Sequence, residues 1–304
     1  MKAGMAEDLP RITIVTPSYN QVAFLEQTIL SVFEQDYPNL QYMVIDGGST
    51  DGSVDIMRRY EKHLDLWISV PDEGQYHALQ KGFSHAKGDL LGWLNSDDVY
   101  LPGALLNVGR AYSQHPGSCI AGPVINFDMR SGKETLVPQF GITFENMVRF
   151  WELQYSWHQP GFFFPRATYE LVGGVDGSLN YLMDHDLTCR LLRHCQVEYV
   201  REPIARFRLH DSSKTCTAAR EMLMEVSTVS QRYWPLLESV DRGRHNRFVA
   251  QRLAGLALRS LPRRPAEAVR LMLESIRRSP AALPGGVLRV VKRWLYTAQP
   301  SRQP

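Results

Sequence analysis

The chain has 304 residues and a net charge of +2. Its residues are 44% hydrophobic and 22% charged, an ordinary composition for a soluble globular protein. This composition excludes a disordered or fibrous chain. The N-terminus lacks the apolar region of a signal peptide, and no apolar run approaches the roughly 20 residues that span a bilayer. The four cysteines show neither CxxC nor zinc-finger spacing, so we expect free thiols and a cytoplasmic protein.

Apolar runs of strand length alternate with helical spacing in the first third of the chain. We expect strands at 11–17, 40–46, 66–70 and 90–94, and helices at 24–33, 54–63 and 75–86. This alternation predicts an α/β fold in which a mostly parallel sheet carries helices on both faces.

Polar side chains follow three of the expected strands. The segment Pro17–Tyr19 ends the first strand, Asp46 ends the second, and Asn95–Asp98 follows the fourth. Right-handed crossovers bring these strand ends to one edge of the sheet, where ligands bind. The two carboxylates of the last segment suit Mg²⁺ or Mn²⁺, and a cation there usually holds a phosphate. Taken alone, the pair is also typical of a solvated turn that caps the next helix.

Two common nucleotide-binding motifs do not occur after any expected strand. Neither GxGxxG nor GxxxxGK[ST] is present there, which disfavours a Rossmann dehydrogenase or a P-loop enzyme.

Aromatic residues are concentrated between residues 140 and 165, ahead of the apolar strand Phe162–Phe164. Trp157 and His158 stand at the entrance of this strand, where aromatic faces can stack on a sugar ring or cover a lipid. A place in the hydrophobic core is an equal alternative for any one of these aromatic residues.

The C-terminal part of the chain differs from the rest in charge. Residues 1–240 carry 20 Lys and Arg against 29 Asp and Glu, whereas residues 241–304 carry 14 against 3. Helices are expected there at 252–259, 266–278 and 287–296. Such basic amphipathic helices bind anionic membranes, and packing on the main domain with the arginines in solvent is the alternative. Nucleic acid is not expected, because few aromatic residues are available to stack on bases.

Several short motifs occur in a fixed order along the chain. They are Thr16–Asn20, Val44–Ser53, Pro71–Gln75, Ala78–Gly82, Lys87–Asp89, Leu94–Asp98, Trp157–Phe164, Gly173–Leu187 and Phe207–Thr215. In this order they resemble the motifs of family 2 glycosyltransferases, inverting enzymes with the GT-A fold that use nucleotide-diphosphate sugars. The resemblance implies a GT-A domain over residues 11–215, with a nucleotide-binding half at 11–100 and an acceptor-binding half at 101–215. It leaves out an N-terminal tail (1–10) and a basic helical extension (216–304).

The resemblance also implies roles for single residues. Those beside the nucleotide sugar are Thr16, Pro17, Tyr19, Asp46, Asp72, Gln75, Asn95 and Asp97, with Asp46 on the uracil or ribose. Asp98 corresponds to the direct ligand of a divalent cation, Mn²⁺ or Mg²⁺, and His210 to a further ligand. The alternative for His210 is a strand-end histidine that is hydrogen-bonded to a neighbour.

A second set of residues corresponds to the chemistry of transfer. Asp184 matches the general base, which takes the proton of the attacking acceptor hydroxyl. Asp186 competes for this role, because Met183 stands where the family often has Glu. Helical spacing puts the two acids on different faces, so at most one should face the acceptor. Acids that only stabilise the first turn of a helix are the structural alternative. The residues matching the acceptor side are Trp157, His158 and Gln159.

Two further departures from the family pattern concern the donor side. Asn95 stands where the family often has Asp, so this element lends less charge to a metal. His77 replaces what is commonly an acid, and an ordinary helix surface residue is its alternative.

Together these features predict an inverting transferase that moves a sugar from a nucleotide-diphosphate sugar, UDP-linked in the first instance, to a glycan or lipid-linked acceptor. The expected setting is cell-surface polysaccharide synthesis, with peripheral contact at the inner face of the plasma membrane through residues 241–304. The alternatives are a sugar-phosphate nucleotidyltransferase, and a non-catalytic nucleotide-sugar-binding or scaffold relative that is recruited to the membrane.

Overall fold

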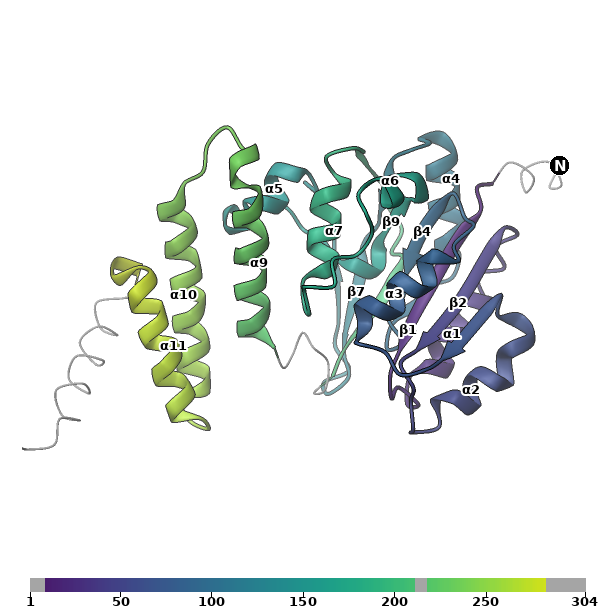
Figure 1. Ribbon diagram of the computed structural model, residues 1–304, viewed down its shortest axis with the longest axis horizontal. Helices are drawn as coiled ribbons and strands as arrows, with labels where there is room; N and C mark the ends of the chain where they lie inside the picture. The colour runs from purple at the N-terminus through teal and green to yellow at the C-terminus, as the bar shows by residue number, and fades with distance from the viewer. Residues whose placement is uncertain (1–8, 211–217, 283–304) are drawn as a thin grey trace, which may run out of the picture. The chain divides into compact units, whose positions relative to one another are not determined.

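The structure of the protein, a computed structural model, describes residues 9–210 and 218–282. The chain divides into two compact units, unit 1 (Met1–Thr217) and unit 2 (Ala218–Pro304), and each is described by itself. Figure 1 shows strands and helices in unit 1 and helices in unit 2. Within the described ranges, no helix combines the length and the hydropathy needed to cross a bilayer.

A mostly parallel sheet forms the centre of unit 1. Its seven strands within the described residues follow the order β10-β6-β9-β4-β1-β2-β3. They are β1 (Ile12–Ser18), β2 (Leu40–Asp46), β3 (Leu66–Ser69), β4 (Leu90–Trp93), β6 (Cys119–Ala121), β9 (Phe162–Pro165) and β10 (Val197–Tyr199). Strand β9 runs antiparallel to β4 and β6, and the other pairs are parallel. The predicted α/β fold with a mostly parallel sheet is confirmed.

Helices cover both faces of this sheet, because its central strands are buried on both sides. Side chains alternate along β1, so Ile12 and Ile14 join a core on one face while Val15 points to the other. The first face carries α1 (Leu25–Phe33), α2 (Ser53–Tyr60) and α4 (Ala104–Gln114), and the second carries α3 (Gln75–Ser84) and α6 (Arg166–Leu171). A Cβ atom at Gly82 would lie 2.5 Å from Cγ1 of Val15, so the absence of a side chain lets α3 approach β1 closely.

The element boundaries in this part agree with the sequence to within a few residues. The helix expected at 54–63 ends as an α-helix at Tyr60 and continues as one 3₁₀ turn, η1 (Glu61–His63). The helix expected at 75–86 ends at Ser84.

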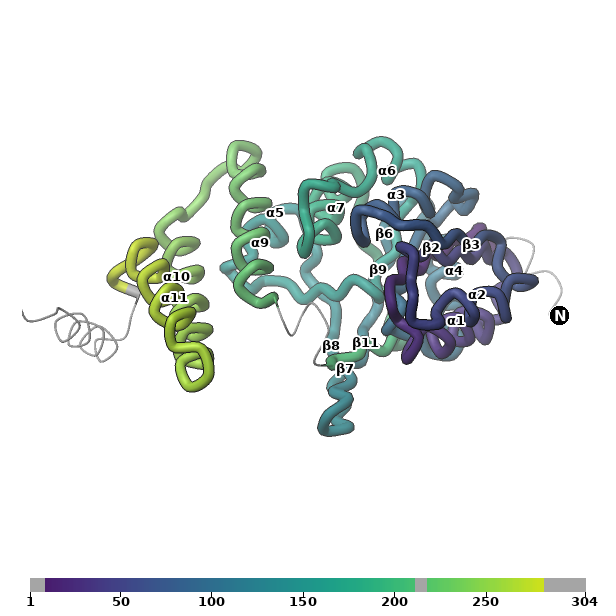
Figure 2. The backbone as a smooth tube through the Cα atoms, turned by 60° about the horizontal axis from the view of Figure 1, so that its bottom comes forward, coloured from purple at the N-terminus to yellow at the C-terminus, as the bar shows by residue number. Residues whose placement is uncertain are grey.

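A second, smaller sheet lies in unit 1 and was not expected. Its four strands within the described residues follow the order β5-β11-β7-β8. They are β5 (Val99–Tyr100), β7 (Val124–Asp128), β8 (Glu134–Val137) and β11 (Ala205–Leu209). The β7–β8 hairpin projects from the body of unit 1 (Figure 2). Because β5 directly follows the segment Asn95–Asp98, this sheet brings β11 beside it.

Short elements complete the second half of unit 1. They are α5 (Phe144–Val148), η2 (Phe150–Glu152), η3 (Gln159–Gly161) and α7 (Met183–Leu191). The expected strand Phe162–Phe164 is β9 and is buried, as predicted.

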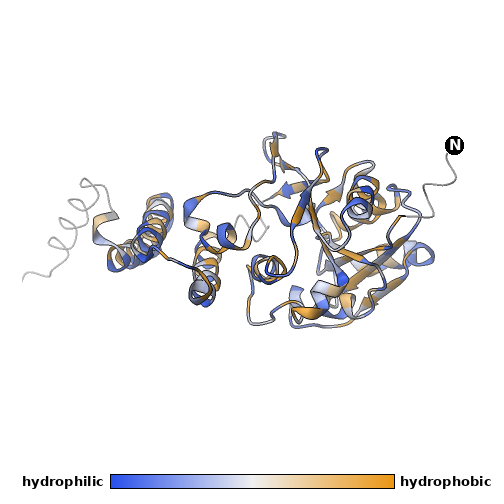
Figure 3. Cartoon of the chain, turned by 90° about the horizontal axis from the view of Figure 1, so that it is seen from above, coloured by the Kyte–Doolittle hydropathy of each residue, from blue (hydrophilic) through white to orange (hydrophobic). Residues whose placement is uncertain are grey.

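Unit 2 is helical in its described part. Its elements are α9 (Ala219–Tyr233), η4 (Trp234–Leu236), α10 (Arg242–Ser260), α11 (Pro265–Arg278) and η5 (Pro280–Ala282). The helix expected at 252–259 is the end of the longer α10, the one at 266–278 is α11, and the one at 287–296 lies outside the described residues. The helices of this unit carry both polar and apolar residues (Figure 3). Leu253 of α10 and Leu271 of α11 belong to its buried side chains.

Candidate active site

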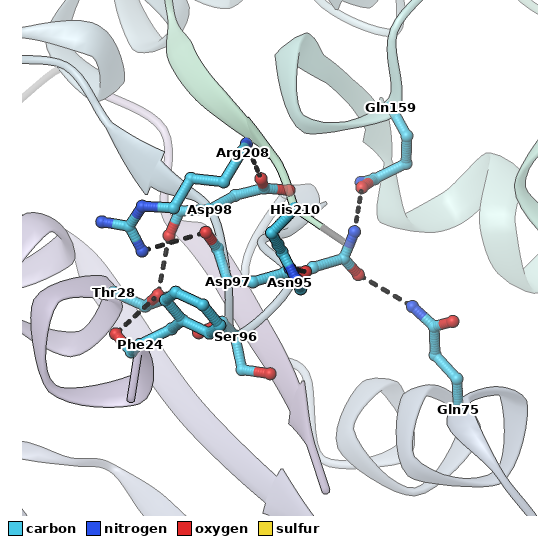
Figure 4. A network of polar contacts seen from close by, with 10 residues as sticks. All are labelled: Phe24, Thr28, Gln75, Asn95, Ser96, Asp97, Asp98, Gln159, Arg208 and His210. Carbon is cyan, nitrogen blue, oxygen red and sulfur yellow. Dashed lines mark hydrogen bonds and ion pairs between the residues drawn. The ribbon is translucent and has the colours of Figure 1, made fainter. Parts of the chain in front are cut away.

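A carboxylate and an imidazole meet at the end of β4. Asp97 follows that strand and His210 follows β11, and Nε2 of His210 lies 3.0 Å from Oδ2 of Asp97. The ring of Phe24 lies 4.8 Å from the His210 ring, centroid to centroid, and limits the positions that the imidazole can take. Figure 4 shows this pair and the polar contacts around it. The sequence identified both residues but not their direct contact.

Arg208 holds the backbone beneath this pair and was missed as a site residue. Its Nη1 donates to the Asp97 carbonyl at 3.0 Å, and its Nη2 donates to Oε1 of Gln27 at 2.6 Å. The guanidinium also lies over the ring of Phe24, 5.6 Å from the centroid. One signal was available in the sequence, since Arg208 and His210 stand two positions apart and such residues share one face of a strand.

Asp98 lies on the buried side of the same turn. Its Oδ1 accepts a hydrogen bond from the backbone N–H of Arg208 at 3.0 Å, and its carbonyl accepts one from the Thr28 hydroxyl at 2.7 Å. Burial, and next the charge of Asp97, raise the pKa of Asp98 well above its usual value. Asp97 is thus the more exposed of the two carboxylates. Because Oδ2 of Asp98 is buried without a hydrogen-bond partner among the described residues, Asp98 as a direct ligand of a cation stays a prediction.

Three side-chain amides form a row beside this turn. Nε2 of Gln75 donates to Oδ1 of Asn95 at 2.8 Å, and Nδ2 of Asn95 donates to Oε1 of Gln159 at 3.4 Å. Gln159 in turn donates to the carbonyl of Trp93 at 2.9 Å. The structure thus joins Gln75 and Asn95, expected at the nucleotide sugar, to Gln159, expected on the acceptor side. The hydrogen bonds at both ends of the Asn95 amide fix its orientation. Because the three amides are uncharged, the row adds no negative charge.

The ends of β1 and β2 contribute mostly buried groups. Thr16 and Pro17 are buried, and Oγ1 of Thr16 lies 3.1 Å from the Tyr42 hydroxyl oxygen. Tyr19, in contrast, is 61% exposed just beyond the end of β1. Thr16 and Pro17 are thus buried at the strand end and Tyr19 is exposed beside it, and contact of the three residues with a nucleotide sugar stays a prediction.

Asp46 organises the loop that follows β2. It is fully buried, and its Oδ2 accepts hydrogen bonds from the backbone N–H groups of Gly48 and Ser49 and from the Ser69 hydroxyl, while Oδ1 accepts from the Ser49 hydroxyl. The carboxylate of Asp72 packs on the same loop, where a Cβ at Gly47 would lie 2.9 Å from its Oδ1. Direct contact of Asp46 with a nucleotide stays a prediction.

The two acids at the start of α7 have different surroundings. Asp186 is 1% exposed, and its Oδ2 accepts from Nε of Arg190 at 2.8 Å. Arg190 also donates to the carbonyls of Val172 and Gly174, so the ion pair fixes the preceding turn. Asp184 is half-buried, and its Oδ1 accepts from the backbone N–H of His185 at 2.7 Å. The geometry favours Asp184 as the acid that an acceptor can reach.

Aromatic rings surround the approach to α7. The ring of Trp157 lies 6.3 Å from that of His185, and the ring of His158 lies 5.0 Å from that of Phe207. Burial lowers the pKa of His158 to about 4 and the pKa of His185 to about 4, so both imidazoles are neutral at pH 7. Trp157 and His158 are half-buried, which leaves both the core role and the acceptor role open to them.

Asp97 and His210 offer a carboxylate oxygen and an imidazole nitrogen to a divalent cation. Within residues 9–210 and 218–282 no group of three or more His, Cys, Asp or Glu side chains is arranged to hold a metal. A cation that also binds substrate phosphates uses only one or two protein ligands, however, and a carboxylate with an imidazole suits Mn²⁺. The residues present fit a metal that is completed by its substrate.

Comparison with known sequences gives one family. A sequence model described as Glycosyl transferase family 2 matches residues 13–171, more than half of the 304 residues. An uncharacterized glycosyltransferase of Rickettsia typhi is 26% identical over 219 residues, which are 70% of this chain and 68% of that protein. TuaG of Bacillus subtilis, whose name assigns it to teichuronic acid biosynthesis, is 37% identical over 95 residues, which are 30% of this chain and 37% of TuaG. The match thus spans little more than a third of TuaG.

Solved structures share the fold at low sequence identity. Staphylococcus aureus TarS 1–349 in complex with UDP-GlcNAc has a TM-score of 0.60 and 14% identity, with 92% of this chain and 84% of that chain covered. The mannosyltransferase PcManGT from Pyrobaculum calidifontis, in complex with GDP-Man and Mn²⁺, has a TM-score of 0.52 and 18% identity, with 97% and 82% covered.

Proposed function

The chain belongs to glycosyl transferase family 2 and has the GT-A fold. We therefore propose that it transfers one sugar from a nucleotide-diphosphate sugar to a glycan or lipid-linked acceptor. UDP-sugars are the first candidates for the donor. The transfer inverts the configuration at the anomeric carbon. The name of TuaG supports a role in cell-surface polysaccharide synthesis.

The observation that carries this proposal is the contact between Asp97 and His210, two residues 113 positions apart that meet at the end of β4. A carboxylate and an imidazole placed together at a sheet edge suit a divalent cation, Mn²⁺ or Mg²⁺, that neutralises the charge of a departing diphosphate. In this role Asp97 and His210 hold the cation, and Arg208 keeps the Asp97 backbone in place.

On the donor side, Tyr19, Asp72, Gln75 and Asn95 contact the nucleotide sugar. Gln75 fixes the amide of Asn95, which then presents a defined hydrogen-bonding edge to the donor. Thr16, Pro17 and Asp46 shape the strand ends behind these groups.

On the acceptor side, Asp184 takes the proton of the attacking hydroxyl. The half-buried position of Asp184 supports this role, whereas Asp186 is buried in its ion pair with Arg190. Trp157 and His158 offer ring faces to the acceptor, and Gln159 links this side to Asn95.

The experiment is a panel of UDP-, dTDP- and GDP-sugars, scored for hydrolysis of the donor with and without Mn²⁺. We expect one nucleotide class to be hydrolysed only with the metal, and Asp97→Asn to reduce that rate about 100-fold or more. Asp55→Asn, on the exposed face of α2, is the matched control and should keep the rate. Failure of Mn²⁺ to increase the hydrolysis of any donor in the panel would contradict the proposal.

The proposal includes an anionic membrane surface as the partner of unit 2. Residues 242–266 contain seven arginines and neither Asp nor Glu. At the turn between α10 and α11, Leu258 and Leu261 are each 53% exposed, beside Arg259, Arg263 and Arg264. Exposed leucines flanked by arginines suit an interface of acyl chains and anionic headgroups.

Flotation with vesicles of phosphatidylglycerol or phosphatidylcholine tests this partner. We expect binding to the anionic vesicles and its loss when Arg259, Arg263 and Arg264 are changed to Gln. Changing Arg242, Arg244 and Arg247 to Gln removes the same charge at the other end of α10 and should cost less binding. Equal losses in the two variants would contradict a contact through this turn.

A further inference from the structure

Two thiols of unit 1 lie in contact across neighbouring elements. Sγ of Cys119, on β6, is 3.0 Å from Sγ of Cys195, which follows α7. The parallel ladder of β6 and β10 fixes both chain segments, because Cys119 pairs with Val197 and its N–H donates to the carbonyl of Gln196 at 2.8 Å. The contact is therefore held by backbone hydrogen bonds on both sides.

We propose that Cys119 and Cys195 are a site of reversible oxidation, at which a hydroperoxide converts the two thiols to a disulfide. A disulfide has an S–S distance of about 2.04 Å, so the sulfur atoms need to approach by only about 1 Å. This pair shares no residue with the proposed donor and acceptor sites and does not depend on the proposed function.

The chemistry balances in two steps. The thiolate of one cysteine attacks the peroxide oxygen and forms a sulfenic acid, with release of water or alcohol once the leaving oxygen has taken up a proton. The second thiol then attacks the sulfenic sulfur, the S–S bond forms, the S–O bond breaks, and one molecule of water leaves. The peroxide accepts the two electrons, and a dithiol reductant restores both thiols.

The surroundings assign different parts to the two cysteines. Cys195 is half-buried and Cys119 is fully buried, so the oxidant reaches Cys195 first. The hydrogen bond from the Cys119 thiol lowers the pKa of Cys195, whereas burial raises the pKa of Cys119. Cys195 is thus the thiol that is oxidised, and Cys119 is the resolving thiol.

The cross-link joins β6 to the turn after α7, and α7 carries one proposed site residue, Asp184, in its first turn. Strand β6 also pairs with β9, which begins three residues after Gln159. Oxidation therefore restrains both of these elements, and it closes a loop between residues 76 positions apart, which favours a more stable fold.

The full-length chain is treated with hydrogen peroxide, alkylated without reduction, digested and analysed by mass spectrometry. We expect a linked peptide that contains Cys119 and Cys195, two hydrogens lighter than the reduced pair and restored by dithiothreitol. We also expect oxidation to raise the Tm by roughly 5–10 °C. The Cys216→Ser background removes the cysteine that lies outside the described residues.

Two variants separate the pair from the other thiols. Cys195→Ser should abolish both the linked peptide and the Tm shift. Cys189→Ala changes a buried thiol on α7 itself and should keep both. A Cys119 that stays reduced after Cys195 has been oxidised, or the same Tm shift in Cys195→Ser, would overturn the proposal.

Discussion

Two neighbouring carboxylates of unit 1 lie in opposite environments, and one arginine accounts for the difference. Asp97 faces His210, whereas Asp98 is fully buried. Arg208 contacts both residues, since its guanidinium binds the carbonyl of Asp97 and its backbone N–H binds the carboxylate of Asp98. The orientation of the turn thus depends on a side chain from β11.

The change Arg208→Lys should disturb this turn. A lysine cannot donate to both the Asp97 carbonyl and Gln27, so we expect a loss of stability of about 1–3 kcal/mol and a weaker affinity for Mn²⁺ in the presence of UDP. Urea unfolding and calorimetric titration measure the two effects. Arg206→Lys, on the same strand in a partly exposed ion pair with Glu134, should change the stability by less than about 0.5 kcal/mol. Equal effects of the two changes would contradict the assignment.

The hydrogen bond from the Arg208 backbone to Asp98 explains what the sequence could not predict about these two acids. The segment Asn95–Asp98 indicated a site, because two acids follow an apolar strand. It could not show which acid faces outward, since the hydrogen bond that buries Asp98 comes from a residue 110 positions later. Local periodicity carries no information about such a partner.

The neutral, half-buried imidazole of His158 makes the stability of unit 1 sensitive to acid. Its pKa is lowered to about 4 in the folded chain by burial, against about 6.5 unfolded. The unfolded chain therefore takes up the proton first as the pH falls, so the stability is full above pH 6.5 and is lost between 6.5 and 4. We expect this group to cost about 2 kcal/mol between pH 7.5 and pH 5.

Urea unfolding at the two pH values measures this cost. His158→Asn removes the titrating group and should lose about 2 kcal/mol less than the parent on acidification. His194→Asn, at an exposed position, should follow the parent. Identical pH profiles of the parent and His158→Asn would contradict the prediction.

The first turn of α7 contains two acids with different exposure: Asp186 is buried and Asp184 is half-buried. Asp186→Asn breaks a buried ion pair with Arg190 and should cost about 3 kcal/mol of stability while leaving donor hydrolysis below the Tm largely intact. Asp184→Asn should do the opposite, with less than about 1 kcal/mol of stability lost and most of the hydrolysis rate gone. Thermal unfolding and donor hydrolysis measure the two properties. If the Asp184→Asn protein hydrolyses the donor at an unchanged rate, Asp186 is the general base instead.

The predictability of the elements follows from their burial. Strands β1, β2 and β4 are apolar because helices cover both faces, and such runs stand out in a sequence. The smaller sheet gave no comparable pattern, since β5 has two residues and three of the four residues of β8 are exposed. Its strands are defined by pairing with distant segments rather than by their own composition.

At the scale of the whole molecule, the two units differ in charge and should separate in function. Unit 1 carries 18 Lys and Arg against 26 Asp and Glu, whereas unit 2 carries 16 against 6. An anionic membrane repels the first and attracts the second. All the residues proposed for donor and acceptor lie in unit 1, which has its own buried core.

A chain that ends at Thr217 should therefore keep one property and lose another. We expect it to bind UDP in Mn²⁺ with a Kd within about threefold of the full chain, because changes at independent sites do not couple. Its flotation with phosphatidylglycerol vesicles should fall to the level seen with phosphatidylcholine. Circular dichroism first establishes that the shortened chain is folded. A folded chain that still floats with anionic vesicles would place the membrane contact in unit 1. A folded chain that no longer binds UDP would contradict the proposal that the nucleotide site needs unit 1 alone.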